Sequence, residues 1–212
     1  MDALQEVNNH MAGDALPALR VNPPRIDPDI ARRIRVVGLD VDGVLTDGGL
    51  YLGAVAGDPV RRVEIKRFDT QDGLGIYFLR EAGLHVVIIT GRVSESVRIR
   101  GAELGVHRVI QDPHARKLPA LMNYLEEIGC TTGEVAFIGD DIPDLPVLRA
   151  IALPVAVANA TSRVMQIAKL RLLNRGGYGA VREFAEALLD ARDEWNDIVE
   201  RYVEQRSSEA MS

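Results

Sequence analysis

From Arg35 onward, short apolar runs alternate with longer helix-like stretches, and this alternation constrains the fold more than any other feature of the chain. The apolar runs have the length of buried strands, whereas the stretches between them have the length of helices. Alternation of this kind predicts an α/β fold, a doubly wound (Rossmann-like) parallel sheet with helices on both faces. We expect strands at residues 36–39, 86–90, 109–110, 135–138 and 155–158, and helices near residues 74–82, 94–104, 118–128 and 145–150.

The two ends of the chain do not follow this alternation. Residues 1–33 are predicted to form an N-terminal extension, because prolines at its C-terminal end remove backbone donors that helices and sheets need. Residues 34–190 then form the main domain, and residues 191–212 a C-terminal helix and tail. Apolar residues recur at helical spacing from Val181 to Tyr202, which predicts one amphipathic helix that packs on the sheet or on a neighbouring subunit.

A β-hairpin is expected after the first strand. Residues 48–53 and 60–68 have strand-like composition and flank a loop of Gly, Asp and Pro. Two such runs around a turn sequence predict an antiparallel hairpin, here projecting from the edge of the sheet.

Composition excludes several classes of protein. The 212 residues suit one domain with tails, and a net charge of −6 argues against nucleic-acid binding, which needs a basic surface. Cys130 is the single cysteine, which excludes an internal disulfide and a cysteine-based zinc site. No apolar run approaches the roughly 18 residues that span a bilayer. The N-terminus lacks the basic start and apolar centre of a signal peptide, so we expect a cytoplasmic protein without a membrane partner.

Asp40 and Asp42 directly follow the apolar run 36–39, and Gly43 then turns the chain. The carboxyl ends of parallel strands are the edge at which open α/β sheets bind ligands. Two carboxylates this close repel each other unless a cation or a proton mediates between them. Taken alone, the pair is equally compatible with a turn in which aspartates satisfy backbone groups.

Three further polar clusters follow predicted strands or begin predicted helices. Thr90 and Gly91 suit a phosphate oxygen at a helix N-terminus, although Thr-Gly after a strand is common in ordinary turns. Lys117 alone reads as a solvated lysine, and acids at a helix start complement its dipole. Together, however, the clusters place carboxylates, a hydroxyl and a lysine on one edge, which predicts a magnesium and phosphate site. The acids of the last cluster are Asp140, Asp141 and Asp144.

Five segments carry a resemblance to a known family. The chain resembles the haloacid dehalogenase superfamily of phosphohydrolases and, within it, the capless 3-deoxy-D-manno-octulosonate 8-phosphate phosphatases and their relatives that act on nine-carbon sugar-acid phosphates. The resemblance covers about residues 35–189. The segments are Asp-Val-Asp-Gly-Val-Leu-Thr-Asp-Gly (40–48), Phe-Asp-Thr-Gln-Asp-Gly (68–73), Ile-Thr-Gly-Arg (89–92), Gly-Asp-Asp (139–141) and Gly-Gly-Tyr-Gly-Ala-Val-Arg-Glu (176–183).

The resemblance implies a Mg²⁺-dependent phosphomonoesterase that hydrolyses a sugar-acid phosphate, most closely octulosonate 8-phosphate, through an aspartyl phosphate. It implies that Asp40 is the nucleophile and that Asp42 is the acid and base, with Thr90 and Lys117 on the transferring phosphoryl group. It assigns the metal to Asp40, Asp42 (backbone carbonyl) and Asp140, with Asp141 and Asp144 in the outer shell. It assigns substrate contacts to Asp69, Thr70, Gln71, Asp72, Gly73, Gly91, Arg92 and Arg100.

The resemblance also implies an assembly. The gaps between the motifs leave no room for a cap domain, yet water must be kept from the aspartyl phosphate. Capless relatives assemble as tetramers in which neighbouring subunits cover each site. We therefore expect a homotetramer, with the hairpin and the C-terminal helix as contact elements.

The chain departs from the octulosonate enzymes at three positions. Where these commonly show Phe-Asn-Val-Arg-Asp-Gly, Asp69 replaces the asparagine and Gln71 the arginine, and Tyr178 replaces the arginine of Gly-Gly-Arg-Gly. These changes keep open a phosphatase for another ulosonate, such as a nonulosonate 9-phosphate. A non-catalytic regulatory domain associated with sugar-nucleotide synthesis is the alternative of a different class, and the complete set of catalytic positions argues against it.

Overall fold

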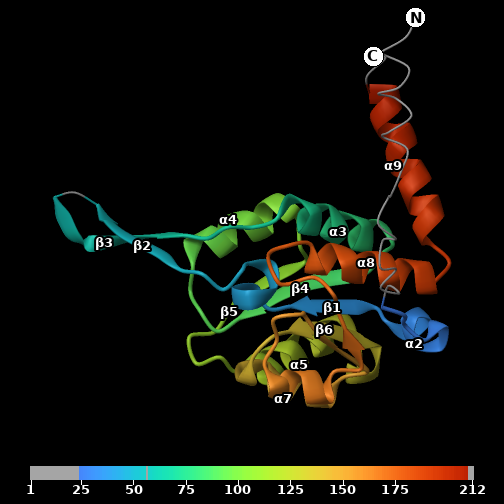
Figure 1. The fold of residues 1–212 in the computed structure, drawn as a ribbon, viewed down its shortest axis with the longest axis horizontal. Coiled ribbons are helices and arrows are strands. Elements are labelled where there is room, and N and C mark those ends of the chain that lie inside the picture. The colour runs from blue at the N-terminus through green and yellow to red at the C-terminus, as the bar shows by residue number, and fades with distance from the viewer. Residues whose placement is uncertain (1–23, 56, 210–212) are drawn as a thin grey trace, which may run out of the picture.

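The computed structural model describes residues 24–55 and 57–209, and a six-stranded parallel sheet forms its centre (Figure 1). The strand order β5-β4-β1-β6-β7-β8 places β1 in the middle of the sheet, between β4 and β6. This confirms the predicted α/β, doubly wound architecture. The strands are β1 (Val36–Leu39), β4 (His85–Thr90), β5 (Arg108–Gln111), β6 (Val135–Gly139), β7 (Leu153–Ala156) and β8 (Leu170–Arg171).

Helices cover both faces of the sheet, and each face has its own apolar core (Figure 1). Side chains alternate along a strand, so Val37 and Leu39 enter one core and Val36 enters the other. One face carries α3 (Thr70–Glu81), α4 (Glu95–Leu104) and α8 (Ala180–Ala191), and the other carries α5 (Lys117–Ile128), α6 (Leu145–Ala150) and α7 (Ser162–Ile167). Short helical turns follow β1 and β6, namely η1 (Val41–Leu45) and η3 (Ile142–Asp144), and a third, η2 (Thr132–Glu134), directly precedes β6.

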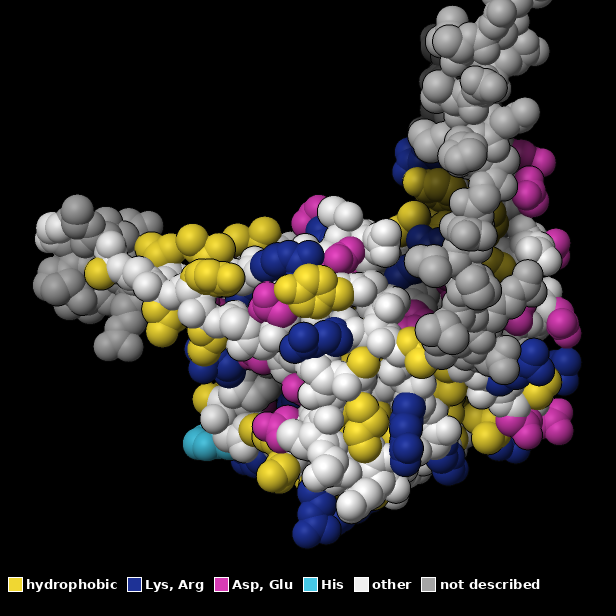
Figure 2. All heavy atoms as spheres, viewed as in Figure 1, with side chains coloured by type: hydrophobic (Ala, Val, Ile, Leu, Met, Phe, Trp, Pro, Cys, Tyr) yellow, Lys and Arg dark blue, Asp and Glu magenta, His cyan; other side chains and the backbone are white. Residues whose placement is uncertain are grey.

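The predicted hairpin is present as a separate antiparallel sheet of β2 (Tyr51–Val55) and β3 (Asp58–Ile65). It projects far from the body of the molecule (Figure 1), and apolar side chains are exposed along it (Figure 2). Among the described residues, only η1, this hairpin and α3 lie between β1 and β4, so no cap domain is inserted there.

The ends of the domain differ in part from the prediction. The single helix expected from Val181 to Tyr202 is wrong: α8 ends at Ala191, and α9 (Trp195–Glu209) begins after a break. Asp193 adopts a left-handed backbone there, with φ 60°, which interrupts the helix although helical spacing continues across it. Before β1, α2 (Pro28–Arg33) packs on α8, with Asp27 as its N-cap. The predicted extension 1–33 lies outside the described residues as far as residue 23.

Two other elements were not predicted, α7 and β8, and β7 begins and ends two residues before the strand expected at 155–158. Both missed elements are short, six and two residues, so neither shows a repeated apolar pattern. Within residues 24–55 and 57–209, no helix combines the length and the apolar character needed to cross a membrane.

Candidate active site

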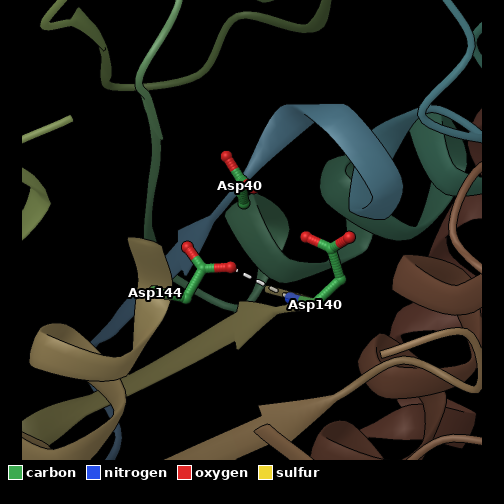
Figure 3. A group of neighbouring side chains, drawn as sticks. All are labelled: Asp40, Asp140 and Asp144. Carbon is green, nitrogen blue, oxygen red and sulfur yellow. Dashed lines mark hydrogen bonds between the residues drawn. The ribbon is translucent and has the colours of Figure 1, made fainter. Parts of the chain in front are cut away.

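The carboxylates of Asp40, Asp140 and Asp144 converge at the carboxyl edge of the central strands (Figure 3). Asp40 follows β1 and Asp140 follows β6, and these strands are neighbours in the sheet. Asp144 ends η3, one turn further along the chain. Each residue contributes a carboxylate oxygen to a group in which all oxygens lie within 4.8 Å of one another. The parallel sheet therefore gathers acids that are about 100 positions apart in the sequence, as the strand-end motifs predicted.

A glycine allows this approach. Gly43 adopts φ +92°, and a Cβ atom at this position would lie 2.0 Å from Oδ2 of Asp140. Any other residue would be strained by its backbone and would also displace the Asp140 carboxylate. The Asp-x-Asp-Gly pattern thus provides the turn as well as the acids.

Lys117 is a buried cation at the centre of the site, with only 4% of its surface exposed. Its Nζ lies 2.7 Å from Oδ1 of Asp40 and 2.6 Å from Oδ1 of Asp144. Burial acts to lower the pKa of Lys117, but the attraction of the two carboxylates outweighs it, and the pKa is raised. The lysine is therefore charged at neutral pH and holds Asp40 in place.

Asp144 organises the loop that carries the other acids. Its Oδ2 accepts hydrogen bonds from the backbone N–H groups of Asp140 (3.0 Å) and Asp141 (3.3 Å), while its Oδ1 accepts from Lys117. Both carboxylate oxygens of Asp144 thus have protein donors. The Asp141 side chain is exposed and lies outside the converging group.

The remaining acids are short of positive charge. Burial, and then the neighbouring Asp144, raise the pKa of Asp40 to about 7 despite the Lys117 ion pair. Burial and the nearby aspartates raise the pKa of Asp140 to about 8, and its Oδ1 is buried without a hydrogen-bond partner among the described residues. An unsatisfied carboxylate oxygen within a cluster of hard oxygen ligands fits a divalent cation such as Mg²⁺. The residues present therefore suit the metal that the sequence predicted.

The predicted phosphate-binding residues lie on the next strand. Thr90 ends β4, beside β1, and is 2% exposed. Gly91 follows, and a Cβ atom there would lie 2.9 Å from the Cβ atom of Ala115, in the loop that leads to Lys117. This close approach brings the end of β4 and the start of α5 to the same edge.

Asp42 lies in a second charged group, which the sequence did not reveal. The ammonium of Lys66 contacts Oδ1 of Asp42, and the Lys66 side chain is 0% exposed. Nε of Arg92 lies 3.7 Å from Oδ2 of Asp42, and Glu64 pairs with Arg92 at 3.0 Å and with Lys66 at 3.6 Å. Alternating charges at the end of a hairpin strand are typical of a solvated face. Only the adjacency of Lys66 to the Phe68–Gly73 motif could have indicated a role.

The predicted substrate segment at the start of α3 divides into two groups. Thr70 and Gln71 are exposed. Asp72 is 1% exposed and accepts a hydrogen bond from the backbone N–H of Arg182 (3.0 Å) in the first turn of α8. Burial raises the pKa of Asp72 to about 6, although backbone N–H groups of α8 counteract it. The carboxylate of Asp72 therefore caps another helix.

Arg100 contacts the same segment from α4. It donates a hydrogen bond to the backbone carbonyl of Asp69 (3.3 Å) and pairs with Glu103 (2.9 Å). A Cβ atom on Gly73 would lie 2.7 Å from Nη2 of Arg100, so the glycine makes room for the guanidinium. Asp69 itself caps α3 by accepting a hydrogen bond from the N–H of Gln71.

The Gly176–Gly179 loop packs against the turn that follows Asp40. The N–H of Gly177 donates to the carbonyl of Val44 (2.9 Å). Asn159 bridges the two segments, because its Nδ2 donates to the carbonyl of Gly43 (3.1 Å) and its Oδ1 accepts from Gly176 N–H (2.7 Å). Asn159 belongs to no motif, and its role follows from the structure alone.

Comparisons with known proteins identify the family of this chain. A family model for haloacid dehalogenase-like hydrolases matches residues 105–175. The 3-deoxy-D-manno-octulosonate 8-phosphate phosphatase KdsC of Escherichia coli K12 is 39% identical over 162 residues, covering 76% of this chain and 82% of the relative.

Solved structures show the same similarity. The Moraxella catarrhalis 3-deoxy-D-manno-octulosonate 8-phosphate phosphatase, in complex with magnesium, phosphate and KDO, is 33% identical with a TM-score of 0.76, over 82% of this chain and 97% of that chain. The cobalt-bound enzyme of Haemophilus influenzae is 36% identical with a TM-score of 0.70, over 78% and 93%. The chain therefore belongs to the 3-deoxy-D-manno-octulosonate 8-phosphate phosphatase family of the haloacid dehalogenase superfamily.

Proposed function

We propose that this protein is a Mg²⁺-dependent phosphatase that hydrolyses 3-deoxy-D-manno-octulosonate 8-phosphate to the free sugar acid and inorganic phosphate. The observation that carries the proposal is the placement of Asp40 between the Lys117 ammonium and the Asp140 carboxylate. A nucleophile for phosphorus needs this combination of an orienting cation and a metal-binding acid. Relatives that share most of the chain carry the same activity in their names.

The reaction follows from the roles of two aspartates. A carboxylate oxygen of Asp40 attacks phosphorus, the bond from phosphorus to the sugar oxygen breaks, and Asp42 donates a proton to that oxygen. Asp42 then takes a proton from the water that attacks phosphorus, which releases phosphate and regenerates Asp40. Lys117 and Thr90 stabilise the charge on the transferring phosphoryl oxygens.

The metal would be held by the carboxylates of Asp40 and Asp140 and the backbone carbonyl of Asp42, with Asp141 and Asp144 in the outer shell. A bound Mg²⁺ supplies positive charge that lets an anionic nucleophile approach a phosphate dianion. Lys117 already neutralises part of the negative charge of the carboxylates. Its two ion pairs keep Asp40 oriented before substrate binds.

The test is a panel of phosphorylated sugar acids assayed with the purified protein. We expect octulosonate 8-phosphate to give the highest kcat/KM with Mg²⁺, and we expect EDTA to abolish turnover. Phosphate release from none of the sugar-acid phosphates would refute the proposal. Gln71 and Tyr178 favour one second candidate, a phosphatase for a nonulosonate 9-phosphate, which the same panel would identify by a higher kcat/KM on that ester.

We also infer a homotetramer, because the site has no cap among the described residues and the projecting hairpin exposes apolar side chains (Figure 2). These include Tyr51, Leu52 and Ile65. Burying such a surface against another copy would shield both the hairpin and the site. Light scattering coupled to size exclusion would measure the mass, and a fully active monomer would contradict this assembly.

A further inference from the structure

A sugar-acid phosphate carries a second anion, its carboxylate, and the site needs a cation to bind it. Most cations near Asp40 already face protein carboxylates. Lys117 has two aspartate partners, Lys66 lies against Asp42 and Glu64, and Arg92 is shared by the same two acids. These groups are suited to catalysis and to holding the acids in place. A further anion requires a cation that faces fewer protein carboxylates than these three, each of which pairs with two.

Arg67 meets this requirement. It follows Lys66 in the chain, and its guanidinium lies 4.4 Å from the centroid of the Tyr178 ring. Nη1 donates a hydrogen bond to the carbonyl of Gly177 (2.5 Å), and Nη2 pairs with one carboxylate, that of Asp69, at 3.6 Å. The side chain remains 45% exposed. The protein therefore holds one face and Nη1 of the guanidinium, and a single carboxylate lies near the rest of this half-exposed group, which leaves room for a ligand carboxylate.

The position of Arg67 connects it to the catalytic turn. Gly177 donates to Val44, and a Cβ atom on Gly177 would lie 2.5 Å from the backbone nitrogen of Asp47, so its loop packs directly on the turn after Asp40. On its other side, Lys66 contacts Asp42. Arg67 is thus anchored between the two segments that border the nucleophile and the acid.

Two of the departures from the octulosonate enzymes meet at this loop. Tyr178 provides the ring on which Arg67 stacks. The Oε1 atom of Gln71 would lie 3.2 Å from a Cβ atom on Gly179, so Gln71 borders the same loop. Gln71 and Tyr178 both stand where the octulosonate enzymes have an arginine. Arg67 nevertheless places a guanidinium between the hairpin and the Gly176–Gly179 loop.

We propose that Arg67, held by Tyr178 and Gly177, binds the carboxylate of the sugar-acid substrate and determines specificity for sugar acids. A guanidinium is suited to a carboxylate because its donors form a planar fork that can make paired hydrogen bonds. Stacking on Tyr178 orders this fork before the substrate arrives, which reduces the entropic cost of binding. The inference depends on the proposed function and specifies which residue of the same site recognises the substrate carboxylate.

The test compares two substrates in Arg67→Ala. Octulosonate 8-phosphate has the carboxylate, and p-nitrophenyl phosphate has none. We expect the ratio of their kcat/KM values to fall by about tenfold or more, mainly through a higher KM for the sugar acid. Arg67→Lys keeps the charge without the planar fork and should recover part of the ratio. Tyr178→Ala should lower the ratio, and Tyr178→Phe, which keeps the ring, should restore it.

Arg175→Ala is the matched control. Arg175 is exposed in the same loop and has no ion pair among the described residues, so this variant removes the same charge without the stacked guanidinium. An equal fall of the ratio in Arg175→Ala, or an unchanged ratio in Arg67→Ala, would overturn the inference and leave the proposed phosphatase intact. A wild-type protein that hydrolyses only p-nitrophenyl phosphate would overturn both.

Discussion

Two regions of the site differ in how deeply their charged side chains are buried: the catalytic edge at the carboxyl ends of the strands, and the rim formed by Arg67 and Arg92. At the edge, Asp40 and Asp144 are buried and both pair with the buried Lys117. At the rim, Arg67 and Arg92 are about half exposed and keep part of their surface open. Buried ion pairs tolerate little change because each partner would leave an uncompensated charge, whereas exposed pairs contribute little to stability. The comparison indicates that the chemistry is held at the edge and that substrate choice can vary at the rim.

The largest effect is expected at the nucleophile. Asp40→Asn keeps the shape of the side chain and removes its nucleophilic oxygen, so kcat should fall by roughly 10⁴-fold or more. Phosphate release under saturating substrate measures this, with the melting temperature as a control for folding. Substantial residual turnover would show that the chemistry is not located at the catalytic edge.

Lys117→Ala tests the buried charge pairs directly. It leaves Asp40 and Asp144 without their cation, so the free energy of unfolding without metal should fall by about 3–5 kcal/mol. Urea unfolding in EDTA measures the loss. The exposed pair of Arg98 with Glu95 offers the matched control, since Arg98→Ala should leave the free energy of unfolding almost unchanged. Equal costs for the two variants would remove the contrast between buried and exposed pairs.

Asp72 is a buried carboxylate without a cation, and it predicts a pH dependence of stability. Its pKa is raised from 3.8 to about 6 in the folded protein. Between these values the folded state binds more protons than the unfolded state, so stability falls as pH rises, by up to about 3 kcal/mol. The loss is complete above pH 6 and absent below the unfolded pKa. Urea unfolding from pH 4 to 7 gives the free energy of unfolding at each pH. This free energy should fall less steeply with pH in Asp72→Asn than in the wild type, and an identical pH dependence would contradict the assignment.

Lys66→Met probes the boundary between edge and rim, because Lys66 is buried and directly follows the hairpin strand β3. Loss of its contact should misplace Asp42 and weaken proton donation. The sugar oxygen is a poor leaving group and p-nitrophenolate a good one, so turnover of the sugar phosphate should fall by about 10²-fold and that of p-nitrophenyl phosphate by less. Equal losses on both esters would show that Lys66 does not act by positioning Asp42 for proton donation.

The smallest effect is expected from Arg92→Ala on stability. Arg92 is half exposed and pairs with Glu64 at 3.0 Å, so the free energy of unfolding should fall by about 1 kcal/mol or less. Urea unfolding beside Lys117→Ala measures the difference. A loss as large as that of Lys117→Ala would mean that the rim is as tightly coupled as the edge.

Much of the fold was readable in the sequence because the strands are buried and the helices regular. The alternation of apolar runs predicted five of the strands, the hairpin and the four main helices between them. The break before α9 could not be predicted from the sequence, because apolar residues continue at helical spacing on both sides of Asp193. Only the positive φ of Asp193 marks the end of the helix. α7 and β8 were missed because a helix of six residues and a strand of two are too short for a repeating apolar pattern.

The sequence by itself determined the chemistry of this protein, since parallel strands bring their carboxyl ends to one edge and the acids, the hydroxyl and the lysine lie at those ends. Only the tertiary structure decided which partner each charge takes. Lys66 meets Asp42, Asp72 caps α8, and Arg67 reaches Gly177 across 110 positions of sequence. Such pairings depend on how separate loops pack against one another, and no local pattern of residues encodes them.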